Sequence, residues 1–206
     1  GHKILERYGM TETNMNASNP LKGERKAGSV GRPLKETSIR ITSIGENNLS
    51  DMNQPGMIEI KGPNVFTGYL NKPEKTKEAF TDDEYFITGD MGYFDKEGYL
   101  FISGRNKDLI ISGGYNVYPK EIEDIINQFD GIIESAVFGL PDDDLGEIPA
   151  AAIVANDNNP NLDNLKKFIQ ENLARYKVPK KYFLLSELPR NVMGKVQKTI
   201  LKDRYL

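Results

Sequence analysis

Four polar residues stand at turns or strand ends, where a side chain can reach a bound molecule: Thr11, Glu12, Asp90 and Lys195. Thr11 and Glu12 follow the stretch Lys3 to Tyr8, which we predict to be a short strand. A hydroxyl at such a turn can donate to a phosphate, and a carboxylate supplies the hard oxygen that Mg²⁺ prefers. A capped turn without a ligand would use the same two residue types.

Asp90 closes an apolar run that begins at Tyr85 and ends in Thr-Gly-Asp. A carboxylate at a strand end can accept two hydrogen bonds from a ribose diol, each charge-assisted and worth roughly 1.5–3 kcal/mol. Lys195 follows Gly194 in a loop before the last predicted helix, so its point charge could reach into a cleft. The alternatives are a simple turn for the first residue and a solvated lysine for the second.

The stretch from Gly104 to Glu123 separates two different parts of the chain. Its polar turn at 105–108 lies between two apolar runs, and backbone with few side chains to bury can change its dihedral angles as a hinge does. Beyond it, Gly113-Gly114 permits positive φ, and Pro119 begins a predicted helix. We interpret the stretch as a hinge followed by a mobile loop. A β-hairpin with a glycine turn, joining two domains, fits equally well.

Composition narrows the function classes. The 206 residues are 38% hydrophobic and 28% charged, enough for one large or two modest cores. No cysteine and one histidine, His2, exclude disulfides, thiolate metal sites and Ser-His catalysis. The net charge of −3, with both signs interspersed, argues against a nucleic-acid partner. No apolar run has transmembrane length, so we expect a cytoplasmic protein without a membrane span.

The elements that position these residues follow from apolar periodicity. From 38 to 104 the period is two, which predicts a small antiparallel sheet with one helix at 73–80, whereas 16–38 is expected to be loop. Beyond the turn at 105–108, strands and helices alternate. The predicted class is α+β: the end of a large α/β domain with a small antiparallel β-subdomain in 1–104, then a compact α+β lid domain in 105–206. In that lid, helices are expected at 120–129, 163–175 and 198–205, and strands at 133–140, 150–155 and 183–185.

Five motifs occur in a fixed order: Tyr8-Gly9-Met10-Thr11-Glu12; Gly56 to Gly62 with Gly68-Tyr69-Leu70; Thr88-Gly89-Asp90; Gly104-Arg105 to Glu123; and Pro189 to Lys195. Together they resemble the AMP-forming adenylating superfamily of acyl-CoA synthetases, carrier-charging adenylation domains and luciferases. The resemblance implies two half-reactions. A carboxylate attacks ATP to give an acyl-adenylate and pyrophosphate, and the thiol of coenzyme A then displaces AMP.

The resemblance also implies roles for single residues. Lys195, Thr11 and Glu12 would be catalytic, with Glu12 as a ligand of Mg²⁺ and Thr11 in contact with phosphate. Lys107 would be the hinge pivot. ATP or AMP would contact Tyr8, Gly9, Thr11, Asp90, Arg105 and Lys195, and the pantetheine of CoA would pass Ser112, Gly113, Gly114 and Tyr115.

The Ser/Thr/Gly-rich phosphate loop of the superfamily and its acyl pocket do not occur in these residues. We therefore expect the carboxy-terminal portion of a synthetase, inactive without the missing amino-terminal part, with a small carboxylate, ATP and CoA as its other partners. The flanks Glu6-Arg7-Tyr8 and Thr13-Asn14-Met15 are most similar to malonyl-CoA synthetases and related acyl-CoA ligases. The alternatives are the lid portion of a carrier-charging adenylation domain and a non-catalytic lid module that binds a partner.

Overall fold

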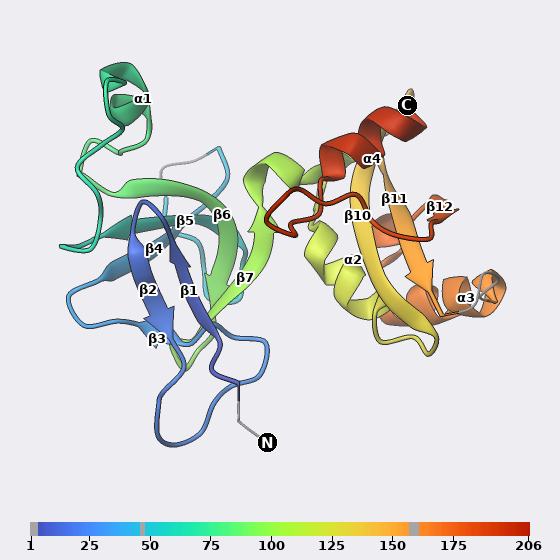
Figure 1. The fold of residues 1–206 in the computed structure, drawn as a ribbon, viewed down its shortest axis with the longest axis horizontal. Helices are drawn as coiled ribbons and strands as arrows, with labels where there is room; N and C mark the ends of the chain where they lie inside the picture. Colours follow the sequence, from blue (N-terminus) through green and yellow to red (C-terminus); the bar gives the residue numbers. More distant parts are fainter. Residues whose placement is uncertain (1–3, 46–47, 157–160) are drawn as a thin grey trace. The chain divides into compact units, whose positions relative to one another are not determined.

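The computed structural model describes residues 4–45, 48–156 and 161–206. Its contacts divide the chain into two compact units, which we call unit 1 (Gly1–Asn106) and unit 2 (Lys107–Leu206). Both contain antiparallel strands and helices, which confirms the predicted α+β class (Figure 1). The assignment of unit 1 to a larger domain and of unit 2 to a lid stays a prediction. Among the described residues, no helix is long and apolar enough to cross a membrane.

Unit 1 begins with a three-stranded antiparallel sheet of β1 (Arg7–Met10), β2 (Asn14–Ser18) and β3 (Arg32–Pro33). The predicted strand at 3–8 was placed too early; its first residue lies outside the described residues, and β1 continues to Met10. The strands approach closely at Gly9, where a Cβ atom would lie 2.2 Å from the Asn14 carbonyl oxygen.

The prediction that 16–38 is loop was wrong for β2 and β3. β2 reads Asn-Met-Asn-Ala-Ser, so it lacks the apolar alternation by which a half-buried strand is detected. It forms because β1 and β3 supply hydrogen-bonding partners on its two edges. The fully buried Asn16 and Ala17 then pack inside unit 1 although only one of them is apolar.

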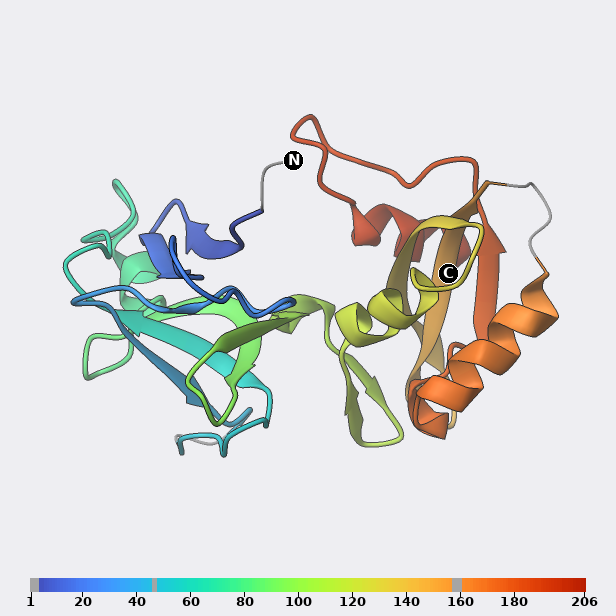
Figure 2. The same cartoon turned by 90° about the horizontal axis from the view of Figure 1, so that it is seen from below.

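The second sheet of unit 1 has four antiparallel strands in sequence order, as the period of two predicted. They are β4 (Ser38–Thr42), β5 (Gly56–Lys61), β6 (Phe86–Phe94) and β7 (Leu100–Arg105). The helix α1 (Pro73–Glu78) stands in the connection between β5 and β6. The first sheet lies across one face of the second (Figures 1 and 2), and Tyr8 and Ala17 share a core with Ile58, Ile60 and Leu100.

Unit 2 is built on two long antiparallel strands, β10 (Ile132–Asp142) and β11 (Gly146–Ala155). The other edge of β11 pairs with β12 (Lys181–Leu184) in parallel and, at its start, with β8 (Ile110–Ser112), which pairs with β9 (Tyr115–Val117). The helices are α2 (Pro119–Ile126), α3 (Leu162–Asn172) and α4 (Lys198–Tyr205), with 3-10 turns η1 (Asn106–Asp108) and η2 (Arg175–Lys177).

Alternate residues of the long strands face two separate cores. Val137 and Ile153 pack with residues of α2 and α3, including Ile122 and Leu165. The neighbouring positions on the same strands pack with Leu201 of α4. The sheet is thus covered by α2 and α3 on one face and by α4 on the other, which explains why its strands are apolar at almost every position.

One buried hydroxyl in unit 2 has no hydrogen-bond partner among the described residues, that of Tyr182 on β12. Burial raises the pKa of Tyr182 to about 12. An unsatisfied buried donor is unfavourable, so Tyr182→Phe is expected to raise the free energy of unfolding by about 1 kcal/mol. Urea unfolding of the 206-residue chain measures this change.

Tyr8→Phe is the matched control, because the Tyr8 hydroxyl donates to Asp90 Oδ2 at 2.7 Å. It should destabilise the chain, since it leaves a buried carboxylate without one of its donors. Equal destabilisation by the two substitutions would show that the Tyr182 hydroxyl has a partner after all, such as an ordered water.

Candidate functional site

The carboxylate of Asp90 lies on β6 and is only 6% exposed. Its Oδ2 accepts the hydrogen bond from Tyr8 on β1, and its Oδ1 lies 3.1 Å from Nε of Arg105, its register partner on β7. The backbone amide of Asp90 donates to the hydroxyl of Thr88 at 3.0 Å, and this hydrogen bond holds the backbone of the Thr-Gly-Asp motif. A carboxylate offers about four acceptor positions, so capacity for further donors remains.

The electrostatics around Asp90 keep its donor in place. Burial and the negative charge of Asp90 raise the pKa of Tyr8, so the phenol stays protonated at physiological pH. The Arg105 side chain is 53% exposed and brings a positive charge to the edge of the same carboxylate. The arrangement is a fixed, largely buried anionic acceptor next to an exposed guanidinium.

The turn Thr11–Thr13 connects β1 to β2 and carries two of the predicted site residues. The Thr11 side chain is exposed. Glu12 is half-buried; Oε1 accepts from the Tyr69 hydroxyl at 3.2 Å, and its carbonyl accepts from the Phe66 amide at 2.8 Å. Glu12 is thereby held against the segment between β5 and α1. No group of three or more metal-ligating side chains occurs among the described residues.

Sequence reasoning missed the amide side chains that fix this turn. Nδ2 of Asn16 donates to the Thr13 hydroxyl at 2.7 Å, and Nδ2 of Asn64 donates to the Thr13 carbonyl at the same distance. Asn64 Nδ2 also lies 3.1 Å from Asn16 Oδ1. Because Asn64 is 48 residues from Asn16, no local pattern could have paired the two.

Residues 110–117 form the β8–β9 hairpin, so the structure shows the hairpin alternative and not the predicted loop. Gly113 and Gly114 make its two-residue turn with φ of 57° and 81°, values that a type I′ turn requires at both positions. Ser112 is buried, and Gly113 donates to the Leu145 carbonyl at 2.9 Å. The exposed Tyr115 ring stacks on Tyr176 with centroids 4.7 Å apart.

Lys195 lies in an exposed loop between β12 and α4. Gly194, with φ of 77°, makes the bend before it. The Asn191 side chain stands inside the bend, where Oδ1 accepts from the amides of Met193 and Lys195, both at 3.0 Å. Figure 2 shows this orange-red loop and the β8–β9 hairpin on opposite sides of unit 2.

The predicted pivot, Lys107, lies in η1 and is exposed. Its φ is not positive. Lys107 also lines a cavity of about 130 Å³ in unit 2 together with Asp108, Glu147, Lys198 and Lys202. The predicted pivot and the beginning of α4 therefore border the same cavity.

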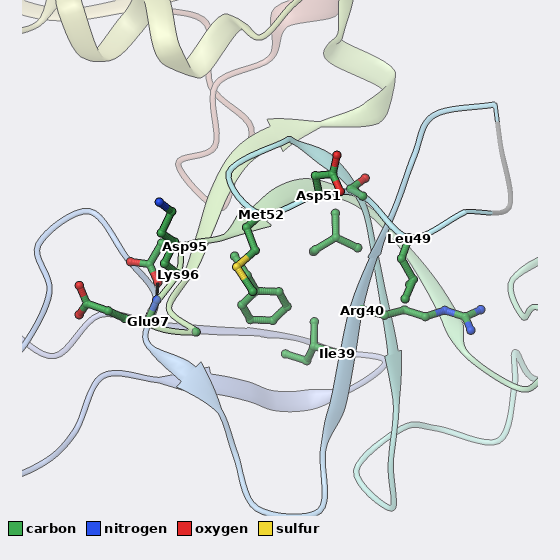
Figure 3. Close-up of a pocket in the computed structure, with 12 residues that line it drawn as sticks. Ile39, Arg40, Leu49, Asp51, Met52, Asp95, Lys96 and Glu97 are labelled. Atoms are coloured by element: carbon green, nitrogen blue, oxygen red, sulfur yellow. Dashed lines mark hydrogen bonds between the residues drawn. The ribbon is translucent and has the colours of Figure 1, made fainter.

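A second cavity, of about 530 Å³, lies in unit 1 and contains none of the predicted site residues (Figure 3). Its apolar side chains come from β4 and from the segment before β5, such as Ile39 and Met52, and Asp95 to Glu97 form one rim. Its volume is in the range of ligand sites. The chemistry predicted from the sequence nevertheless gathers around Asp90.

Within unit 1, the fold brings Tyr8, Asp90 and Arg105 into contact and holds the Thr11 and Glu12 turn beside Tyr69. Gly9 allows the close approach of β1 and β2 and has no side chain to contribute. Within unit 2, the hairpin and the Lys195 loop are separate features. The buried carboxylate of unit 1 is the kind of fixed polar group by which small-molecule sites orient a ligand.

Comparison with known protein families identifies the class of protein to which this chain belongs. Residues 1–70 match the sequence model described as "AMP-binding enzyme", and residues 121–195 match "AMP-binding enzyme C-terminal domain". The chain therefore belongs to the AMP-binding enzymes. Asp90 and the predicted pivot lie between the two matched segments.

Similar proteins extend the match over nearly the whole chain. The "Probable CoA ligase CCL8" of Humulus lupulus is 44% identical over 99% of the chain, and the malonate–CoA ligase of Arabidopsis thaliana is 42% identical over 98%. ATP-bound MatB from Rhodopseudomonas palustris superposes on 99% of the chain with a TM-score of 0.93 and 50% identity. The chain spans only 35%, 34% and 41% of these proteins, respectively.

Proposed function

We propose that the chain is the carboxy-terminal part of an ATP-dependent, AMP-forming acyl-CoA synthetase. The full-length enzyme adenylates a small carboxylic acid and transfers the acyl group to CoA, and its other partner is the amino-terminal part of the same protein. Support comes from relatives named as CoA ligases and from the similarity to an ATP-bound structure.

The observation that carries the proposal is the Asp90 carboxylate. It is buried, and donors from two other strands hold it, one on each oxygen. Such a fixed acceptor suits the two hydroxyls of a ribose, which need acceptors of defined position. Tyr8 and Arg105 act in this proposal by orienting Asp90 and by bordering the nucleotide. Gly9 permits the close strand approach next to Tyr8.

Glu12 is the residue that we propose holds Mg²⁺. One of its oxygens is bonded to Tyr69, and the other has no partner among the described residues. A single carboxylate fits Mg²⁺, which usually takes one or two carboxylates and completes its shell with phosphate oxygens and water. An ion held by Glu12 would supply charge neutralisation at the phosphates. Thr11, exposed on the same turn, would donate to a phosphate.

The two loops of unit 2 are assigned to different half-reactions. Lys195 would stabilise the charge that develops during adenylation, and Ser112 to Tyr115 would border the pantetheine during thioester formation. Lys107 would be the pivot between the two. Support is the separation of the two loops on unit 2 (Figure 2) and their different construction, a hairpin turn and a bend around Asn191.

Malonate is the acid that we propose. The support is the name of the Arabidopsis thaliana relative, together with the resemblance of residues 6–8 and 13–15, at β1 and β2, to malonyl-CoA synthetases.

Exchange of pyrophosphate into ATP by the full-length protein tests the activity with acetate, malonate, succinate and a long fatty acid. Malonate is expected to give the highest rate. If acetate or the fatty acid gave an exchange rate about tenfold above that of malonate, the choice of malonate would be contradicted.

The same assay tests the site. Asp90→Asn removes the charge at nearly constant size and is expected to raise the KM for ATP by about tenfold or more, since charged hydrogen bonds contribute about 1.5–3 kcal/mol. Asp143→Asn, at an exposed carboxylate in the β10–β11 turn, is the matched control and should change little. Absence of exchange with every carboxylate would refute the proposed function.

A further inference from the structure

The position of the Lys195 side chain depends entirely on its loop. The amine has no ion pair or hydrogen bond in the part of the chain that the structure describes, and the residue is exposed. Its neighbours Val192 and Met193 are exposed as well, at 105% and 70%, and cannot anchor the loop by packing. A free lysine carries about 2 kcal/mol of rotamer entropy. Any preorganisation of its point of attachment must come from the backbone.

That backbone is closed by bonds at both ends of the bend. The Asn191 amide donates to the Lys195 carbonyl and the Gly194 amide to the Asn191 carbonyl, both at 2.9 Å. Together with the two amides on Asn191 Oδ1, these bonds give residues 191–195 one conformation. They are local and do not reach the sheet. Near the two ends of the loop, Leu188 and Val196 pack in the core between the sheet and α4, but the bend itself has no apolar contact there among the described residues.

Arg190 supplies the connection to the sheet. Its Nη1 donates to the Gly194 carbonyl at 2.6 Å, and its Nη2 bonds to Oε2 of Glu134 on β10. One guanidinium thus joins the residue before Lys195 to a rigid strand. An arginine presents its donors in a rigid planar fork, whereas the ammonium of a lysine is a compact point charge. The Glu134 carboxylate, with 29% of the side chain exposed, fixes which way that group points.

The far end of the loop has a similar attachment. Lys198, the first residue of α4, pairs with Oε1 of Glu123 on α2 at 2.6 Å. The same oxygen accepts from the Val137 amide of β10 at 2.8 Å. Both ends of the loop are thus tied to β10 through a carboxylate, and Lys195 lies between the two attachments.

We propose that Glu134, acting through Arg190, is a positioning residue for Lys195 and therefore for adenylation alone. The inference rests on the proposed function. Glu134 does not touch a substrate; it holds the guanidinium that holds the Gly194 carbonyl. In the proposed function, thioester formation uses the β8–β9 hairpin, which lies on the other side of unit 2 (Figure 2), and should not depend on this attachment.

The test compares half-reactions of the full-length protein. Glu134→Ala is expected to lower kcat for adenylation by about tenfold to 10²-fold, because small misplacements of a catalytic group cost this much. The KM for ATP and the rate of thioester formation from supplied acyl-adenylate should stay unchanged. Glu134→Gln, which keeps an acceptor for Arg190, should lose less of the adenylation rate than Glu134→Ala. Arg190→Lys, which cannot bridge both partners, should lose as much of that rate as Glu134→Ala.

Lys202→Ala is the matched control. Lys202 pairs with Glu147 of β11 at 2.8 Å, and the exposed side-chain fractions of 40% and 28% nearly equal the 43% and 29% of Arg190 and Glu134. Pairs of this exposure contribute little to stability, so both variants should unfold at nearly the same temperature, and Lys202→Ala should retain adenylation within about twofold.

Three results would overturn the inference: equal adenylation by Glu134→Ala and wild type, equal losses in Glu134→Ala and Lys202→Ala, or equal slowing of both half-reactions by Glu134→Ala. In each case the wild-type activity would leave the proposed function standing. A wild-type protein without carboxylate-dependent exchange would instead refute the proposed function, and the role of Glu134 with it.

Discussion

Replacing Lys195 by alanine in the full-length protein is expected to slow adenylation by about 10²–10³-fold, the usual cost of removing one donor from developing charge. The side chain is exposed at the end of a fixed bend, so its removal disturbs no packing and no ion pair that the structure describes. Thioester formation from supplied acyl-adenylate should continue, because the charge on the α-phosphate that Lys195 would stabilise develops only in the transition state of adenylation.

Single-turnover measurements of the two half-reactions check this result. Lys180→Ala, at another exposed lysine of unit 2, is the control and should leave both rates unchanged. Equal loss of the two half-reactions in Lys195→Ala would contradict the assignment and return Lys195 to a role in the structure of the loop.

The second large effect is expected from proline at Lys107. The residue lies in the 3-10 turn η1, and the φ typical of such a turn is close to that of proline. Lys107→Pro should therefore retain the orientation that uses this φ. An orientation that needs another φ would be disfavoured by about 3 kcal/mol, which is about 10²-fold in rate.

The expected result is near-normal adenylation with strongly slowed thioester formation, if the present φ belongs to the adenylating orientation. Lys107→Ala keeps the freedom of the backbone and should slow thioester formation far less than Lys107→Pro. It is therefore the control. We expect two orientations because the loop that carries Lys195 and the β8–β9 hairpin lie on opposite sides of unit 2 (Figure 2). Both variants slowing both steps alike would show that 104–123 is only a linker.

Local patterns determined many of the elements. Apolar residues three and four apart predicted α2 and α3. A final helix was expected at 198–205, and α4 spans those residues. The β6–β7 hairpin followed from a charged four-residue turn between two aromatic runs. The sequence also singled out Asp90 and Lys195. The glycine turn before Lys195 is present, but the strand end expected at Asp90 is wrong: β6 continues to Phe94, and pairing with β7 carries the strand past Asp90.

Only the tertiary structure decided which distant residues meet. Tyr8 and Asp90 are 82 residues apart, and Glu134 and Arg190 are 56 apart, so no periodicity connects either pair. The polar strand β2 and the choice between hairpin and mobile loop at Gly113 were decided in the same way, by hydrogen-bonding partners elsewhere in the chain. A periodic pattern reports which face of an element is buried, whereas the partner of a buried polar group depends on how the chain returns to it.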